Sequence, residues 1–78
     1  MTKLSCTKKG VCCKFISTSC AADLGHRLLE MGFVPGEDIT VMANTGSKGT
    51  VMVKVKGSKV ALSNKIADNI LVKEKEDE

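Results

Sequence analysis

The sequence has 78 residues, a formal net charge of +3 at pH 7 and a hydrophobic content of 42%. This length is enough for one domain with a thin core, which must be aliphatic because the chain has two phenylalanines and no tryptophan or tyrosine. The sequence has neither a signal-peptide pattern nor an apolar run of the roughly 20 residues that a membrane helix needs. We therefore expect a cytoplasmic protein whose four cysteines are reduced thiols, with a disulfide-bonded secreted domain as the alternative.

The charge is distributed unevenly along the chain. Residues 73–78 carry two lysines and four acidic residues, whereas residues 1–72 carry ten basic residues against five acidic ones, a net charge of +5. Such a basic body can attract an acidic partner or anionic headgroups, although scattered lysines also keep a domain soluble without binding anything. We expect one folded domain over residues 1–72 and a charged, disordered tail over residues 73–78.

The first half of the chain predicts a strand followed by a helix. Residues 11–16 alternate between apolar and polar positions, which is typical of a half-buried strand, and the Ser-Thr-Ser run at 17–19 offers N-caps for a helix. The apolar period then becomes helical over residues 20–31, and Gly32 is placed to end the helix in a left-handed conformation. The buried stripe expected on this helix consists of Ala21, Leu24, Leu28 and Met31.

The second half predicts strands joined by turns. A turn at 34–37 contains Pro and Gly, Gly57 and Ser58 predict a tight hairpin turn, and Ser63 and Asn64 cap one short helical turn. The expected strands after the helix are residues 39–44, 51–56, 59–62 and 70–72. Five short strands with one inserted helix do not suit a parallel α/β sheet. The prediction is a mainly β protein, a small five-stranded antiparallel barrel with one helix after the first strand.

The segment 27–39, which reads Arg-Leu-Leu-Glu-Met-Gly-Phe-Val-Pro-Gly-Glu-Asp-Ile, and the run 55–62, Val-Lys-Gly-Ser-Lys-Val-Ala-Leu, resemble the FeoA family. The resemblance spans about residues 4–72. It implies an SH3-like barrel and an accessory or regulatory role in ferrous iron uptake, through contact with the cytosolic GTPase region of an FeoB-type transporter. Two alternatives stay open: a domain that binds or senses a transition metal, and a generic SH3-like adaptor.

A metal site is one hypothesis for the helix. Asp23, His26 and Glu30 share its polar face at spacings that let them reach one divalent ion, with Cys12 as a further candidate ligand because its side chain points outward. The competing interpretation is a solvated face with an Asp23–Arg27 pair. We expect no required cofactor, and at most a weakly bound zinc or ferrous ion.

Partner contact is the second hypothesis. Leu29 lies off the expected buried stripe, so it is a candidate apolar contact together with Met42 and Met52, unless the helix simply buries a wide arc. Lys54 and Lys56 form a basic strip with Lys59 that would face an acidic partner. No aromatic residue accompanies this strip, so we expect no nucleic-acid partner, and we expect no membrane insertion. Weak self-association is left open.

Catalysis is not expected from this sequence. The single histidine has no serine or cysteine partner nearby in the chain, and no glycine-rich phosphate loop precedes a helix.

Overall fold

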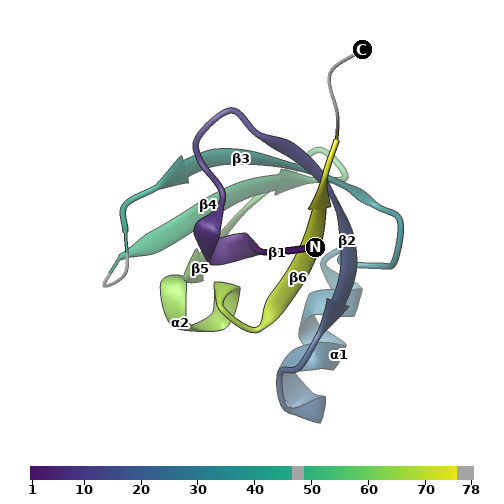
Figure 1. Ribbon diagram of the computed structural model, residues 1–78. Helices are drawn as coiled ribbons and strands as arrows, with labels where there is room; N and C mark the ends of the chain where they lie inside the picture. The colour runs from purple at the N-terminus through teal and green to yellow at the C-terminus, as the bar shows by residue number, and fades with distance from the viewer. Residues whose placement is uncertain (47–48, 76–78) are drawn as a thin grey trace.

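The computed structural model describes residues 1–46 and 49–75, which form a strongly curled antiparallel sheet with short helices at one end (Figure 1). The strands, in chain order, are β1 (Thr2–Lys3), β2 (Cys12–Thr18), β3 (Asp38–Asn44), β4 (Thr50–Val55), β5 (Ser58–Ser63) and β6 (Ile70–Glu74). The helices are a 3-10 turn η1 (Leu4–Cys6), α1 (Ala22–Glu30) and α2 (Asn64–Ala67). No helix among these residues is long and apolar enough to cross a membrane.

The mainly β architecture with a helix inserted between its first long strands confirms the predicted fold class. The strand order is β1-β6-β2-β3-β4-β5, with every neighbouring pair antiparallel. The sixth strand was not predicted: β1 is only two residues long and pairs Thr2 with Val72 at the other end of the chain. Helix α2 contacts both η1 and β5, so it lies between the two ends of the sheet.

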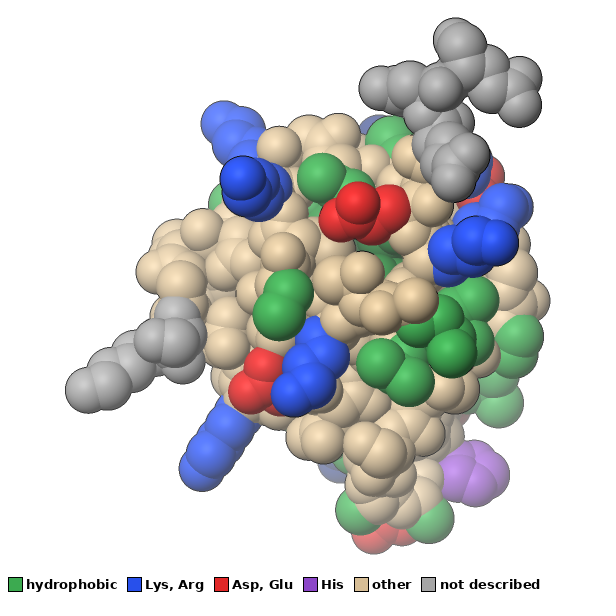
Figure 2. All heavy atoms as spheres, viewed as in Figure 1, with side chains coloured by type: hydrophobic (Ala, Val, Ile, Leu, Met, Phe, Trp, Pro, Cys, Tyr) green, Lys and Arg blue, Asp and Glu red, His purple; other side chains and the backbone are tan. Residues whose placement is uncertain are grey.

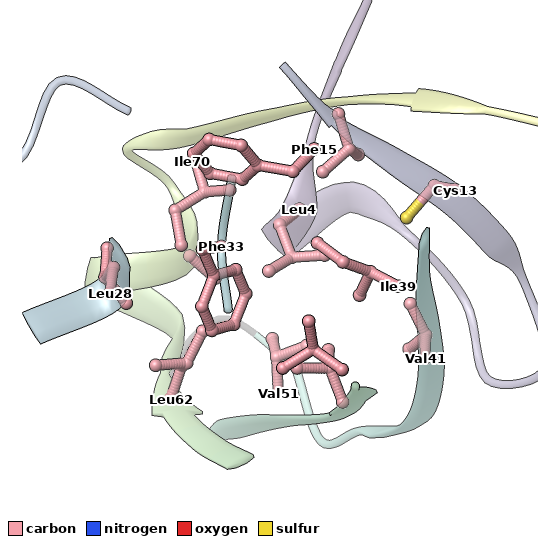
Figure 3. Packing of buried hydrophobic residues seen from close by; sticks show 14 residues of the cluster. Leu4, Cys13, Phe15, Leu28, Phe33, Ile39, Val41, Val51, Leu62 and Ile70 are labelled. Carbon is pink, nitrogen blue, oxygen red and sulfur yellow. The ribbon is translucent and has the colours of Figure 1, made fainter. Parts of the chain in front are cut away.

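The core fills the inside of the curled sheet (Figure 3). It is almost entirely aliphatic, as the composition required, and the two phenylalanines meet edge to face with ring centroids 6.0 Å apart. Its members are Leu4, Cys13, Phe15, Leu28, Phe33, Ile39, Val41, Val51, Val53, Val55, Leu62, Ala67, Ile70 and Val72. Most of these side chains come from the long strands, while Leu4 comes from η1, Leu28 from α1, Phe33 from the turn after α1 and Ala67 from α2. The sheet rather than α1 therefore contains most of the buried surface.

Two predicted boundaries differ from the structure. The β4–β5 hairpin turn consists of Lys56 and Gly57, with φ of 50° and 78°, instead of Gly57 and Ser58. Strand β6 continues through Lys73 and Glu74, which the sequence had placed in the tail. Lys75 follows the strand, and the last residues of the predicted tail, 76–78, lie outside the described part of the chain.

Candidate partner-binding surface

Helix α1 begins without a side-chain cap. Its N-cap residue is Ala21, and the Ser-Thr-Ser run that was expected to cap it is used elsewhere. The Thr18 hydroxyl accepts a hydrogen bond from the backbone N–H of Cys20 at 3.1 Å and donates one to the carbonyl of Asn69 at 2.9 Å. The end of β2 is therefore tied to the loop between α2 and β6, and the predicted capping role was wrong.

The other end of α1 is closed by backbone hydrogen bonds around Gly32. The N–H of Phe33 donates to the carbonyl of Leu28 at 2.9 Å, and the N–H of Gly32 donates to the carbonyl of Leu29 at 3.1 Å. Gly32 has φ of 107°, which confirms its predicted left-handed conformation. This closing turn sends Phe33 into the core directly after the helix.

The closing turn sets which leucine faces inward. Leu28 is 1% exposed and packs into the core, whereas the next residue, Leu29, is 50% exposed. Met31 is 38% exposed, and Ala21 is exposed too, so the predicted buried stripe was wrong at those two positions. Leu29 and Met31 are therefore two exposed apolar side chains at the C-terminal end of α1, of which the sequence had indicated Leu29 alone.

Lys56, in the turn of the β4–β5 hairpin, lies against the C-terminal end of α1. A Cβ atom added to Gly32 would lie only 3.1 Å from Cδ of Lys56, so the lysine stem crosses the end of the helix. Its ammonium group lies 3.7 Å from Oε1 of Glu37. A cation at this position also interacts favourably with the partial negative charge of the helix C-terminus.

The outer face of the hairpin carries further exposed basic and apolar side chains. Lys54 pairs directly across from Lys59, and Met52, 38% exposed, pairs across from Ala61. We call Leu29, Met31, Met52, Lys54, Lys56 and Lys59 the helix–hairpin surface. Met42 is placed differently, because the β3–β4 register shifts between Val41 and Ala43, and Met42 is half-buried in this irregularity.

The predicted metal ligands are not brought together. Asp23, His26 and Glu30 are all exposed on α1, as their spacing predicted, while Cys12 lies on the outer face of β2 with its Sγ 3.8 Å from Oγ1 of Thr40. No group of three or more His, Cys, Asp or Glu side chains within residues 1–46 and 49–75 is arranged to hold a metal ion.

The buried cysteine has a different chemistry from its neighbour. Burial, with smaller contributions from Glu74 and Cys12, raises the pKa of the Cys13 thiol to about 11. A thiol that stays protonated is a poor nucleophile and a poor metal ligand, so Cys13 serves as a small apolar core residue.

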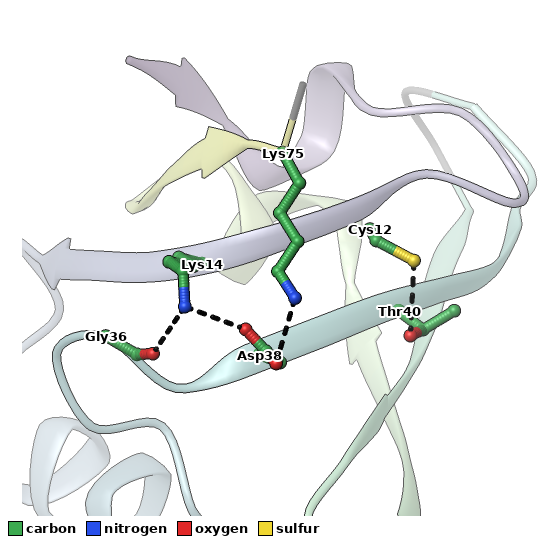
Figure 4. A network of polar contacts seen from close by, with 6 residues as sticks. All are labelled: Cys12, Lys14, Gly36, Asp38, Thr40 and Lys75. Carbon is green, nitrogen blue, oxygen red and sulfur yellow. Dashed lines mark hydrogen bonds and ion pairs between the residues drawn. The ribbon is translucent and has the colours of Figure 1, made fainter. Parts of the chain in front are cut away.

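An ion-pair network that the sequence did not reveal joins three strands (Figure 4). Asp38 at the start of β3 accepts hydrogen bonds from Lys75 at 2.9 Å and from Lys14 at 3.1 Å. Lys75 and then Lys14 hold the pKa of the Asp38 carboxyl below its usual range. The network fastens the end of β6 to β2 and β3, and it lies outside the helix–hairpin surface.

Apolar surface also occurs away from α1. Figure 2 shows hydrophobic side chains gathered beside β2, on the face that the view presents, with lysines near them. Ile16 of β2 and Leu71 of β6 are both half-buried. Exposure alone therefore does not single out Leu29, whose distinction is its place in the last turn of α1, three residues before Gly32, which lies against the Lys56 stem.

The architecture is that of a small SH3-like barrel with an inserted helix. Comparison with protein-family models matches residues 1–74 to the FeoA domain. The chain belongs to the FeoA family, which is associated with ferrous iron transport.

Solved structures agree with this assignment. FeoA of Stenotrophomonas maltophilia, a prokaryotic SH3 domain protein solved in complex with zinc, is 27% identical, with a TM-score of 0.77 over 92% of this chain and 89% of that one. Iron(II) transport protein A of Clostridium thermocellum is 31% identical, with a TM-score of 0.79 over 94% and 45%. FeoA of Chlorobium tepidum, at 23% identity, shares the fold, with a TM-score of 0.86 over 94% and 70%. No match was found among proteins of curated function.

Proposed function

We propose that this protein is an accessory factor of ferrous iron uptake that binds the cytosolic GTPase region of an FeoB-type transporter through its helix–hairpin surface. Membership of the FeoA family supports the iron-transport role. The relative from S. maltophilia has been put forward as an activating factor of bacterial ferrous iron transport, which supports association with a transporter.

The observation that carries the proposed surface is the exposure of Leu29 in the last turn of α1, at the helix end that the Lys56 stem crosses. An apolar anchor bordered by charges is the usual arrangement of a protein-binding site, since the anchor supplies affinity and the charges supply steering. Both phenylalanines of the chain are buried, so it has no exposed aromatic residue with which to build a groove for proline-rich peptides. A specific partner surface therefore fits better than a generic adaptor.

The test is capture of the transporter's isolated GTPase domain by the immobilised protein, with and without guanine nucleotide. We expect Leu29→Asp to weaken capture at least tenfold, about 1.4 kcal/mol, without changing the circular dichroism spectrum. Ala22→Asp is the matched control, because it adds the same charge to an exposed position at the other end of α1. Equal capture by both variants would rule out Leu29 as the anchor, and no capture by the wild type would rule out the partner.

Weak metal binding on α1 is a second proposal, motivated by the zinc complex of the S. maltophilia relative. His26 and Glu30 lie one turn apart on an exposed face, and Asp23 lies one turn before His26, so the three side chains can approach a divalent ion after rotamer changes. Titration with zinc, followed by NMR, should shift the resonances of His26 and Glu30 in the wild type, and should leave Glu30 unmoved in His26→Ala. An unmoved His26 at millimolar zinc would exclude the site.

A further inference from the structure

Strand β5 ends the sheet. It pairs with β4 and with no other strand in the described ranges 1–46 and 49–75. A two-residue hairpin turn makes its flanking residues, Val55 and Ser58, a hydrogen-bonded pair, and hydrogen-bonded and non-bonded pairs then alternate along the ladder. The backbone N–H and C=O groups of Lys59 and Ala61 therefore point away from β4, toward the free edge.

This edge carries none of the irregularities that protect other strands. The β4–β5 ladder runs without a register shift from Thr50 opposite Ser63 to Val55 opposite Ser58. By contrast, the ladders of β2 with β6 and of β3 with β4 each contain one shift. The other edge strand of the sheet, β1, has only two residues, against six in β5. Because bulges are a common means of stopping an edge from pairing further, the regular β5 edge is the better shaped of the two to accept another strand.

The row of inward-facing side chains that crosses β3, β4 and β5 is not fully covered at its β5 end. Val41, Val53 and Val60 lie side by side across β3, β4 and β5, and the first two are 1% and 0% exposed. Val60 is only partly buried, and Leu24 of α1 and Ile66 of α2 are also partly buried against the same core. An apolar side chain placed beyond β5 in this row would cover Val60 and complete its burial.

The outer row has an unbalanced charge. Thr40, Lys54 and Lys59 lie side by side across the same three strands, and neither lysine is in an ion pair within the described residues. Like charges directly opposite one another destabilise a sheet. A lysine on an edge strand guards against aggregation, which accounts for Lys59 but not for the lysine facing it on β4. An acidic side chain beyond Lys59 would neutralise this pair.

We propose that the β5 edge binds an extended segment of a partner protein by strand addition, and that this segment alternates apolar and acidic residues. The apolar residues cover Val60, the acidic residues meet Lys59 and Lys54, and the main chain bonds to Lys59 and Ala61. The proposal does not depend on which protein supplies the segment. A second copy of this chain is a poorer occupant, because its net charge of +3 repels another copy and its own β5 brings a lysine instead of an acid.

The test uses the full chain labelled with nitrogen-15 and a synthetic peptide. The peptide alternates glutamate and valine over about eight residues, the length of a long strand. We expect the peptide to bind and to slow hydrogen exchange at the amides of Lys59 and Ala61, which the free protein leaves open to solvent. A peptide of the same composition with its glutamates grouped at one end should not protect them. Binding of the grouped peptide with equal affinity and equal protection would overturn the proposal.

Variants separate strand addition from simple charge attraction. Lys59→Glu should weaken peptide binding about tenfold, whereas Lys73→Glu, which makes the same charge change on β6, should change it less than about twofold. Ala61→Pro should abolish binding while the protein stays folded, since proline is tolerated on an edge strand whose N–H faces solvent. If Ala61→Pro does not fold, the Lys59 and Lys73 variants decide. The proposal would be contradicted if both lysine variants lost equal peptide affinity. It would also be contradicted if, without peptide, the β5 amides became more protected from hydrogen exchange as the protein concentration rises.

Discussion

The β4–β5 hairpin and helix α1 use their side chains in opposite ways. In β4 every second residue, Val51, Val53 and Val55, is buried in the core, and its ladder to β5 is regular throughout. In α1 only Leu28 is fully buried, and the residue after it is half exposed. The difference shows that the hairpin contributes stability to the barrel, while the helix, held mainly at Leu28 and the Gly32–Phe33 turn, keeps an outward face free for contact.

The largest effect is expected inside the hairpin. Val53→Ala removes two methyl groups from a fully buried position and leaves a cavity, so it should lower the free energy of unfolding by about 2–3 kcal/mol. Urea unfolding followed by circular dichroism measures this loss. A change below about 0.5 kcal/mol would mean that the sheet relaxes around the gap, and that the hairpin is not the rigid part of the molecule.

Stability at alkaline pH tests the part of the core that β2 supplies, through Cys13. The Cys13 thiol has its ordinary pKa of 9.0 in the unfolded chain, whereas burial raises its pKa to about 11 in the native state. Between these values the unfolded state binds fewer protons, so stability should fall as pH rises, by at most about 3 kcal/mol. Thermal unfolding of Cys13→Ala should show a flatter dependence over that range, and an unchanged dependence would show that other groups cause it.

Gly32 tests the junction between the two regions. Gly32→Ala forces a left-handed conformation on a residue with a Cβ and crowds the Lys56 stem, so we expect a loss of about 1–2 kcal/mol. Gly25→Ala is the matched control within α1, where the new Cβ meets nothing within 4 Å and helix propensity improves, with a gain of up to about 1 kcal/mol. Opposite signs for the two variants in urea unfolding would support the closing turn as described.

The smallest effect is expected on the exposed side of the helix. Leu29→Ala should change the free energy of unfolding by less than about 0.5 kcal/mol, because its side chain is half exposed and leaves no core cavity. A loss near that of Val53→Ala would show that Leu29 supports the barrel, and the partner-binding interpretation would lose its basis.

The sequence predicted those parts of the fold that depend on local pattern. The alternation of Val51, Val53 and Val55 can be interpreted from neighbouring residues alone, and so can the glycine at position 32. The short β1 strand could not be predicted in this way, because two residues carry no period and the strand exists through pairing with β6. The hairpin turn was placed one residue late because Lys56 adopts a left-handed conformation that usually indicates glycine or asparagine.

The candidate site was predictable to a similar degree. The off-stripe position of Leu29 correctly indicated an exposed leucine, and alternation placed Met52 and Lys54 on an outer face. The contact between Lys56 and the helix end, and the Asp38 network, depend on how distant segments meet. Neither leaves a signal in the spacing of residues along the chain.

The position of β6 has a consequence for how the protein is made. The last strand of the chain lies between the first two, β1 and β2, so neither has its full set of neighbours until residues 70–74 have left the ribosome. Until then the nascent chain would carry open strand edges, which delays completion of folding until β6 has emerged. A chain truncated before Ile70 would keep those edges permanently and should aggregate during synthesis in vitro.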